Sequence, residues 1–167
     1  RKNEQRFLHA EKIARIGSWE WNLSTDEMRW SPEMYRLHGV APVQVPRPSL
    51  DLALSYVHPD DSARVAEAAR AARAGVLPHT VEYRLRRSDG TALRVVAEGA
   101  LIRDAEGRPA RLVGTVQDIT ERKITEEKTS EIRDLLRLVI DSTPDWIFAK
   151  DLSHRFLMVN RSFAEAQ

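Results

Sequence analysis

The sequence of 167 residues contains no cysteine. This absence excludes disulfide bonds, thiolate metal sites and cysteine nucleophiles, and it fits the reducing cytoplasm. No apolar run approaches the ~20 residues that a membrane-spanning helix needs. A signal peptide is also missing, because the polar start, residues 1–5, is followed by no apolar stretch. We therefore expect a cytoplasmic protein, or the cytoplasmic part of a membrane-anchored one.

The sequence also lacks an excess of positive or negative charge. The 26 Lys and Arg residues and 25 Asp and Glu residues are interspersed and leave a net charge of +1. This balance offers no basic surface for nucleic acid. A Gly-rich phosphate loop, a Gly-x-Ser-x-Gly elbow and a kinase signature are missing, so we expect no enzyme activity from this chain and no catalytic residues. The sequence also lacks an initiator Met, which we interpret as a piece of a longer protein.

The first part of the chain alternates between short helical and strand patterns. Apolar residues from Phe7 to Ile16 follow helical spacing, and Gly17 is expected to end this helix. Trp19, Trp21 and Leu23 then alternate with polar residues, which predicts a half-buried strand. A second short strand is expected to follow directly, at residues 28–30.

Helices are expected between the second strand and Gly75. Ser31 and Pro32 form a helix start, with an N-cap followed by proline at the first helical position. The aspartates of residues 60–61 suit the first turn of a later, alanine-rich helix. The predicted helices span residues 32–38, 50–57 and 59–74, with a proline-rich loop at residues 41–49.

Strand patterns fill residues 81–119, separated by the turns Ser88-Asp89-Gly90 and 104–107. Consecutive strands joined by tight turns form an antiparallel meander. The chain is therefore expected to be an α+β protein, with helices on one face of an antiparallel sheet and flanking amphipathic helices.

Several motifs of this pattern resemble PAS domains of the PAS-fold-3 subtype, with a C-terminal PAC motif, from bacterial-type multidomain signalling proteins. The motifs are Gly17–Leu23, Trp30–Tyr35, His58–Asp61, Glu82–Arg86 with Asp89 and Gly90, and Gly114–Lys123. They occur in the order that the family shows. The resemblance implies a five-stranded antiparallel sheet with helices that enclose a small central cavity.

The pattern changes after Lys123. Ile132, Leu135 and Val139 have the three-then-four spacing of a coiled-coil seam, which predicts a helix that pairs with a second copy of the chain. Residues 143–167 resemble the truncated start of a second PAS domain. The expected organisation is an N-terminal amphipathic helix at 1–16, a PAS/PAC sensor domain at 17–123, a signalling helix at 124–142 and this truncated repeat.

Cofactors are left unknown, but some are disfavoured. Haem in PAS domains is held by a histidine on the helix that faces the sheet, and residues 62–75 contain none. Covalent flavin chemistry needs a cysteine, and the glutamine of light-sensing relatives would fall at Val116. His58, with the adjacent aspartates 60 and 61, suits a helix start better than a metal site.

Small and aromatic residues suggest a ligand pocket. Small residues on the inner face of the strands either leave a cavity or let a helix approach closely. The tryptophans are more typical of core packing than of ligand stacking. The pocket candidates are Trp19, Trp21, Trp30, Tyr56, Tyr83, Val95, Ala97, Gly99, Gly114 and Val116.

Asp118 and Thr120 lie where the last strand becomes the signalling helix, and both residue types cap helices. We expect them to relay a change in the sheet to this helix. The predicted function is a sensory module that binds a small ligand, or transmits a conformational change, to an output domain. Relatives carry a histidine kinase of a two-component system, a cyclic-di-GMP enzyme or a chemoreceptor as output. The alternative is a ligand-free dimerisation or scaffold module, with a collapsed core.

Overall fold

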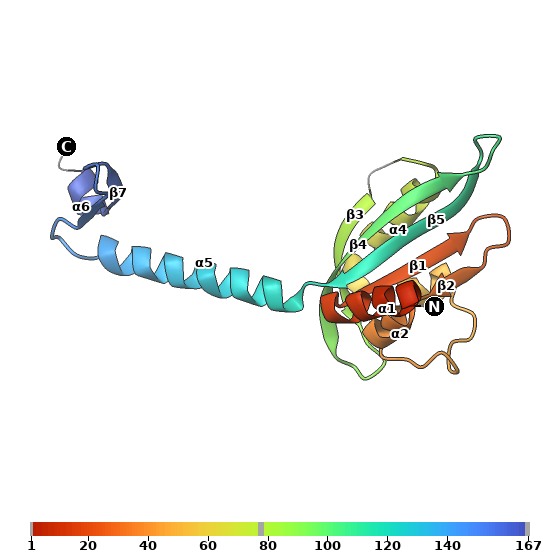
Figure 1. Cartoon of the computed structure of the whole chain (residues 1–167). Helices are drawn as coiled ribbons and strands as arrows, with labels where there is room; N and C mark the ends of the chain where they lie inside the picture. Colours follow the sequence, from red (N-terminus) through yellow and green to blue (C-terminus); the bar gives the residue numbers. More distant parts are fainter. Residues whose placement is uncertain (1, 77–78, 166–167) are drawn as a thin grey trace. The chain divides into compact units, whose positions relative to one another are not determined.

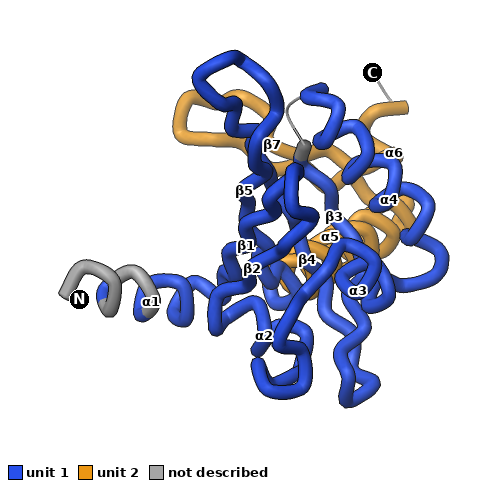
Figure 2. The backbone as a smooth tube through the Cα atoms, turned by 90° about the vertical axis from the view of Figure 1, so that its right-hand side faces the viewer, with its two compact units in different colours: residues 1–121 blue, residues 122–167 orange. Residues whose placement is uncertain are grey.

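The structure is a computed structural model that describes residues 2–76 and 79–165. The chain divides into two compact units, residues 1–121 and 122–167 (Figure 2). The side chains of Phe7 and His79 lie outside the described residues.

The N-terminal helix α1 (Lys2–Ala14) ends earlier than expected, and the prediction that Gly17 ends it is wrong. Arg15 leaves the helix with a φ of 53°, and strand β1 (Ile16–Asn22) already contains Gly17. A Cβ at Gly17 would lie 2.7 Å from the backbone nitrogen of Met34. This glycine is therefore needed because helix α2 (Pro32–His38) lies directly against β1, a tertiary contact that local sequence rules do not register.

A five-stranded antiparallel sheet with helices forms the first unit, as expected of an α+β PAS fold (Figure 1). Its strands lie in the order β2-β1-β5-β4-β3. Besides β1, they are β2 (Met28–Trp30), β3 (His79–Arg86), β4 (Ala92–Arg103) and β5 (Pro109–Asp118). The last three form the predicted meander, and β5 then pairs with β1, so the two ends of the unit meet in the middle of the sheet.

Local signals fix the helices that cover the inner face of this sheet. The Ser31 hydroxyl accepts a hydrogen bond from the Met34 N–H at the start of α2, and Gly39 ends that helix with a φ of 72°. Helix α3 (Leu50–Ser55) and helix α4 (Pro59–Arg73) follow. The core lies between the helices and the alternate residues of the strands, with Leu37, Leu85, Val95 and Leu112 almost completely buried.

The second unit consists of most of helix α5 and a small hairpin structure. Helix α5 (Thr120–Asp141) is followed by strands β6 (Phe148–Lys150) and β7 (Phe156–Val159), which pair antiparallel, and by helix α6 (Arg161–Ala164). None of the described helices combines the length and the apolar composition required to cross a membrane.

Candidate functional site

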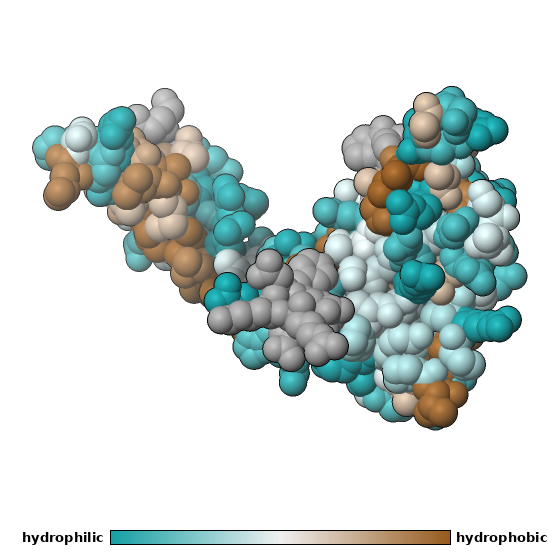
Figure 3. Space-filling model, turned by 45° about the vertical axis from the view of Figure 1, so that its right-hand side comes forward, coloured by the Kyte–Doolittle hydropathy of each residue, from teal (hydrophilic) through white to brown (hydrophobic). Residues whose placement is uncertain are grey.

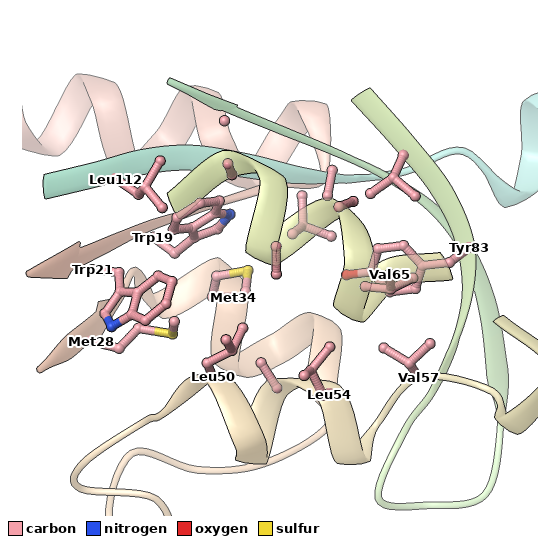
Figure 4. A pocket seen from close by; sticks show the side chains of 18 of the residues that line it. Trp19, Trp21, Met28, Met34, Leu50, Leu54, Val57, Val65, Tyr83 and Leu112 are labelled. Carbon is pink, nitrogen blue, oxygen red and sulfur yellow. The ribbon is translucent and has the colours of Figure 1, made fainter. Parts of the chain in front are cut away.

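A cavity of about 120 Å³ lies between the inner face of the sheet and helices α2, α3 and α4 (Figure 4). Most of its wall is apolar. Its sheet side includes the inward-facing residues of β1, β3, β4 and β5, and its helix side is dominated by alanines and leucines. A pocket with such a wall binds apolar groups, provided that they match its size.

Seven of the ten predicted pocket residues line this cavity: Trp19, Trp21, Trp30, Tyr83, Ala97, Gly99 and Val116. Tyr56, Val95 and Gly114 do not. Val95 is fully buried within the packed core. Tyr56 lies at the C-cap of α3 and meets the edge of the His38 ring at 5.1 Å. Both residues therefore lie outside the wall of the cavity.

Gly114 has a different role from the one predicted. It pairs with Trp19 across β1 and β5, and a Cβ on Gly114 would lie 2.4 Å from the Trp19 ring and 2.2 Å from the Glu98 carbonyl oxygen. The space that this glycine leaves is filled by the indole. The sequence offered a cavity or the close approach of a helix as explanations of this small residue, and neither applies, because the group that approaches closely is a tryptophan of the neighbouring strand.

His38 is the buried polar residue of the wall that sequence reasoning missed. Its Nδ1 lies 2.8 Å from the Met34 carbonyl oxygen and must donate, because a carbonyl only accepts. The ring stacks on Trp30 with centroids 4.3 Å apart. Burial lowers the pKa of His38, so the ring is neutral at pH 7 and its Nε2 has a lone pair that can accept a hydrogen bond.

Tyr83 supplies a second polar atom. Figure 4 shows its hydroxyl directed toward the middle of the pocket. No described residue forms a hydrogen bond with this hydroxyl, and burial raises its pKa, so it stays protonated. Trp21 and Trp30 have already used their indole N–H groups on Asp26 and the Met28 sulfur. The Tyr83 hydroxyl therefore remains available to a bound molecule.

Helix α4 contributes one face of the cavity, and the sequence carried a signal for it. Val65, Ala68, Ala69 and Ala72 recur at the three- and four-residue spacing of one helix face, and all four line the cavity. Met28 and Met34 also line it. Nothing in the local sequence singles out His38, because its burial depends on how α2 packs.

Hydrogen bonds fix the helix start at His58. The His58 side chain accepts a hydrogen bond from the Asp60 N–H, and Asp61 accepts hydrogen bonds from the backbone N–H and the guanidinium of Arg84. These bonds hold the pKa of Asp61 well below its ordinary value. Among the side chains that the structure describes, no group of three or more His, Asp and Glu residues is placed to bind a metal ion.

The junction between β5 and α5 is tied to β4 by hydrogen bonds. Asp118 accepts a hydrogen bond from the Thr120 N–H at 2.9 Å, as a helix cap does. The Thr120 hydroxyl, in contrast, accepts from the Arg94 N–H at 2.9 Å, and the Ile119 N–H donates to the Arg94 carbonyl at 2.8 Å. Thr120 thus connects the helix to the strand that carries Ala97.

The same junction is connected to the N-terminal segment. The Asp118 N–H donates to the Arg15 carbonyl oxygen at 3.1 Å, and the Arg15 guanidinium donates to Glu121 at 2.9 Å. Arg15 lies between α1 and β1. The start of α5 is therefore held by contacts from both the sheet and the segment that precedes it.

Helix α5 carries an exposed apolar face. The three predicted seam residues, Ile132, Leu135 and Val139, are each more than half exposed in the single chain. Figure 3 shows apolar surface gathered over residues of the second unit. An apolar face of this kind is stable in water mainly when a partner covers it.

Asn160 organises the second unit. It is completely buried, and its side chain uses all of its hydrogen-bonding capacity. Its Oδ1 accepts from the N–H groups of Ile147 and Phe163, and its Nδ2 donates to the carbonyl oxygens of Ile140 and Asp145. One side chain thus joins the end of α5, the hairpin and the start of α6.

The sequence of this chain is similar to a known protein family and to several curated proteins. A family model described as the PAS fold matches residues 27–116. The probable diguanylate cyclase DgcE of Escherichia coli is 26% identical over 157 residues, which are 93% of this chain and 14% of that protein. The two-component sensor PprA of Pseudomonas aeruginosa is 31% identical over 111 residues, which are 66% of this chain and 12% of that protein. The chain therefore spans only a small part of these curated relatives.

Solved structures of signalling proteins have the same fold as this chain. A sensory box histidine kinase/response regulator from Burkholderia thailandensis has a TM-score of 0.63 and 32% identity, over 79% of this chain and 98% of that one. The N-terminal domain of a diguanylate cyclase with a PAS/PAC sensor, from Marinobacter aquaeolei, has a TM-score of 0.57 and 24% identity, over 65% of this chain and 98% of that one. The second likeness bears on the fold alone.

Proposed function

Because this chain belongs to the PAS-fold family, whose domains are sensory rather than catalytic, we propose that it detects a small molecule in its central cavity and relays the event through α5. The observation that carries the proposal is the hydrogen-bonded junction at Thr120. β4 contributes Ala97 and Gly99 to the cavity wall, and the same strand binds the first residue of α5 through Arg94.

The route from the cavity to the helix is short and consists of the β4 backbone and the Thr120 side chain. In β4, Arg94 and Ala97 lie in the same continuous strand, paired on both sides. A ligand that shifts β4 must therefore shift the donor to Thr120 or break that bond. Either event alters how α5 starts, which is the change that a downstream domain would receive.

The recipient is proposed to be an output domain of the same polypeptide, reached through a second PAS repeat that begins at residue 143. The relatives named above are a probable diguanylate cyclase and a two-component sensor. In the second unit, Trp146, Phe148, Phe156 and Phe163 make mutual ring contacts at 5.3–5.9 Å. This aromatic cluster would serve as one side of the core of the second repeat.

Signalling through α5 is proposed to involve a homodimer. Two copies of the helix would bury Ile132, Leu135 and Val139 against each other, as in a parallel coiled coil. A ligand-free scaffold would use the same seam, so dimerisation does not separate the two functions. The two functions differ in whether the cavity binds a ligand.

The experiment is mass spectrometry of small molecules released when purified protein is denatured. The chain is compared with Ala97→Trp, which fills the cavity, and with Ala100→Trp, the same change at an exposed position of β4. We expect the parent and Ala100→Trp to release a molecule that Ala97→Trp does not. Release of nothing from any of the three proteins would favour the ligand-free scaffold.

A further inference from the structure

The described residues of the cavity wall include no lysine or arginine. Its ionisable residues are His38, Tyr83 and Glu98, and the pKa directions of the first two keep them neutral at pH 7. Glu98 is exposed, and alternation along β4 directs its side chain away from the face that carries Ala97 and Gly99. A charged ligand would lose its hydration without gaining a counter-charge, so the wall selects neutral molecules.

The volume limits the size of the molecule. The cavity of about 120 Å³ is well below the ~300–1,000 Å³ of pockets for drug-sized ligands. An apolar cavity of about 150 Å³ in another protein holds benzene. The cavity is therefore in the size class that holds a single six-membered ring, and flavin or haem would require the helices to move apart.

Water alone is a poor occupant. A water molecule held in such a space needs two to four polar partners. The described wall offers few polar atoms, chiefly the Tyr83 hydroxyl and the His38 Nε2, with the unpartnered indole N–H of Trp19. Figure 4 shows the Trp19 nitrogen and the Tyr83 oxygen directed toward the middle of the pocket from opposite sides.

We propose that the cavity binds a neutral, mostly apolar molecule about the size of phenol, whose one polar group is bound by the Tyr83 hydroxyl. The proposal rests on the sensory function proposed above and specifies the chemical class of its ligand. The aromatic and thioether side chains of the wall suit a planar ring. Tyr83 can donate to or accept from the polar group, so it sets orientation without demanding a charge.

The test is calorimetric titration of the whole chain with phenol, benzene and benzoate. We expect phenol to bind best, benzene more weakly and benzoate not measurably. Tyr83→Phe should reduce phenol affinity about tenfold and change benzene affinity less than about twofold, since one hydrogen bond is lost. Tyr56→Phe, which removes a hydroxyl outside the cavity wall, should leave both affinities unchanged.

The outcomes separate the ligand class from the sensory function. Benzoate binding as tightly as phenol, or phenol binding to Ala97→Trp as tightly as to the parent, overturns the proposed class. If the parent binds none of the three probes but releases a larger or charged molecule that Ala97→Trp lacks, the class is wrong and the sensory function stands. If no probe binds and nothing is released, both are wrong.

Discussion

The Thr120 hydroxyl accepts a hydrogen bond from the Arg94 N–H at 2.9 Å, and so joins the first residue of α5 to a strand of the cavity wall. This bond crosses from helix to sheet, whereas an N-capping bond stays within the helix end. The junction therefore has a specific donor and acceptor whose loss can be measured.

Thr120→Val removes this acceptor and keeps the shape of the side chain. We expect the Arg94 amide to exchange its hydrogen at least about tenfold faster, because an amide that loses its hydrogen bond becomes open to solvent. Hydrogen exchange followed by NMR measures the exchange rate of this amide. The control is Thr129→Val, whose hydroxyl donates only within α5, to the Thr125 carbonyl. Equal exchange of the Arg94 amide in both variants would show that Thr120 does not hold the strand.

The ionic contact between α4 and β3 predicts a pH dependence. Asp61 accepts from the Arg84 N–H at 3.0 Å and from its Nε at 2.9 Å, and its pKa is lowered in the folded state. A lowered pKa means that Asp61 stabilises the fold above the unfolded-state value near 4, and that this contribution is lost as the pH falls below it. Asp61→Asn should cost about 1–2 kcal/mol at pH 7.

The control for this prediction is the neighbouring carboxylate. Asp60 is largely exposed and reaches Arg84 through a single contact at 3.1 Å, so Asp60→Asn should change the unfolding free energy by less than about 1 kcal/mol. Urea unfolding from pH 3 to pH 7 measures both variants. The difference between parent and Asp61→Asn should shrink toward pH 3, and a constant difference would contradict the ionic explanation.

The paired glycines Gly99 and Gly114 predict opposite tolerance to the same substitution. They face each other across β4 and β5 beneath Trp19. A Cβ at Gly114 would clash with Glu98 and Trp19, whereas a Cβ at Gly99 meets the Trp19 ring at an ordinary 3.4 Å. Gly114→Ala should cost about 3 kcal/mol or more, and Gly99→Ala should change stability by less than about 1 kcal/mol. Thermal unfolding distinguishes them, and equal costs would contradict the packing of Trp19.

Local signals predicted much of the fold. Ser31 with Pro32 and the turn glycine Gly90 each act through neighbours in the sequence, and their elements begin or end where expected. Gly17 and Gly114 were misjudged for one shared reason. Each accommodates a group from a distant segment, Met34 in one case and Trp19 in the other. The burial of His38 likewise depends on tertiary packing, which no single-sequence pattern encodes.

The seam of α5 predicts concentration-dependent association. Leu135→Lys places a charge where a second copy of the helix would cover it, and should weaken the dimer more than about tenfold. Leu138→Lys, an equally exposed leucine of the same helix outside the predicted seam, should weaken it less. Sedimentation at several protein concentrations measures the dimer affinity of both variants. The same mass for parent and Leu135→Lys at every concentration would argue against this interface.

Asn160 predicts how the second unit is held together. Asn160→Asp keeps the size of the side chain and both acceptor bonds, but it removes the two N–H donors and places a carboxylate beside the carbonyl oxygens of Ile140 and Asp145. Burying like-charged oxygens without a donor is costly, so the amides of Ile147 and Phe163 should lose protection against hydrogen exchange. Asn22→Asp at the end of β1 makes the same chemical change within the first unit, where the Oδ1 accepts from the N–H groups of Ser24 and Thr25, and should leave these amides unchanged. If Asn160→Asp leaves them protected as well, the hairpin and α6 are stabilised by the aromatic cluster around Phe163 rather than by this side chain.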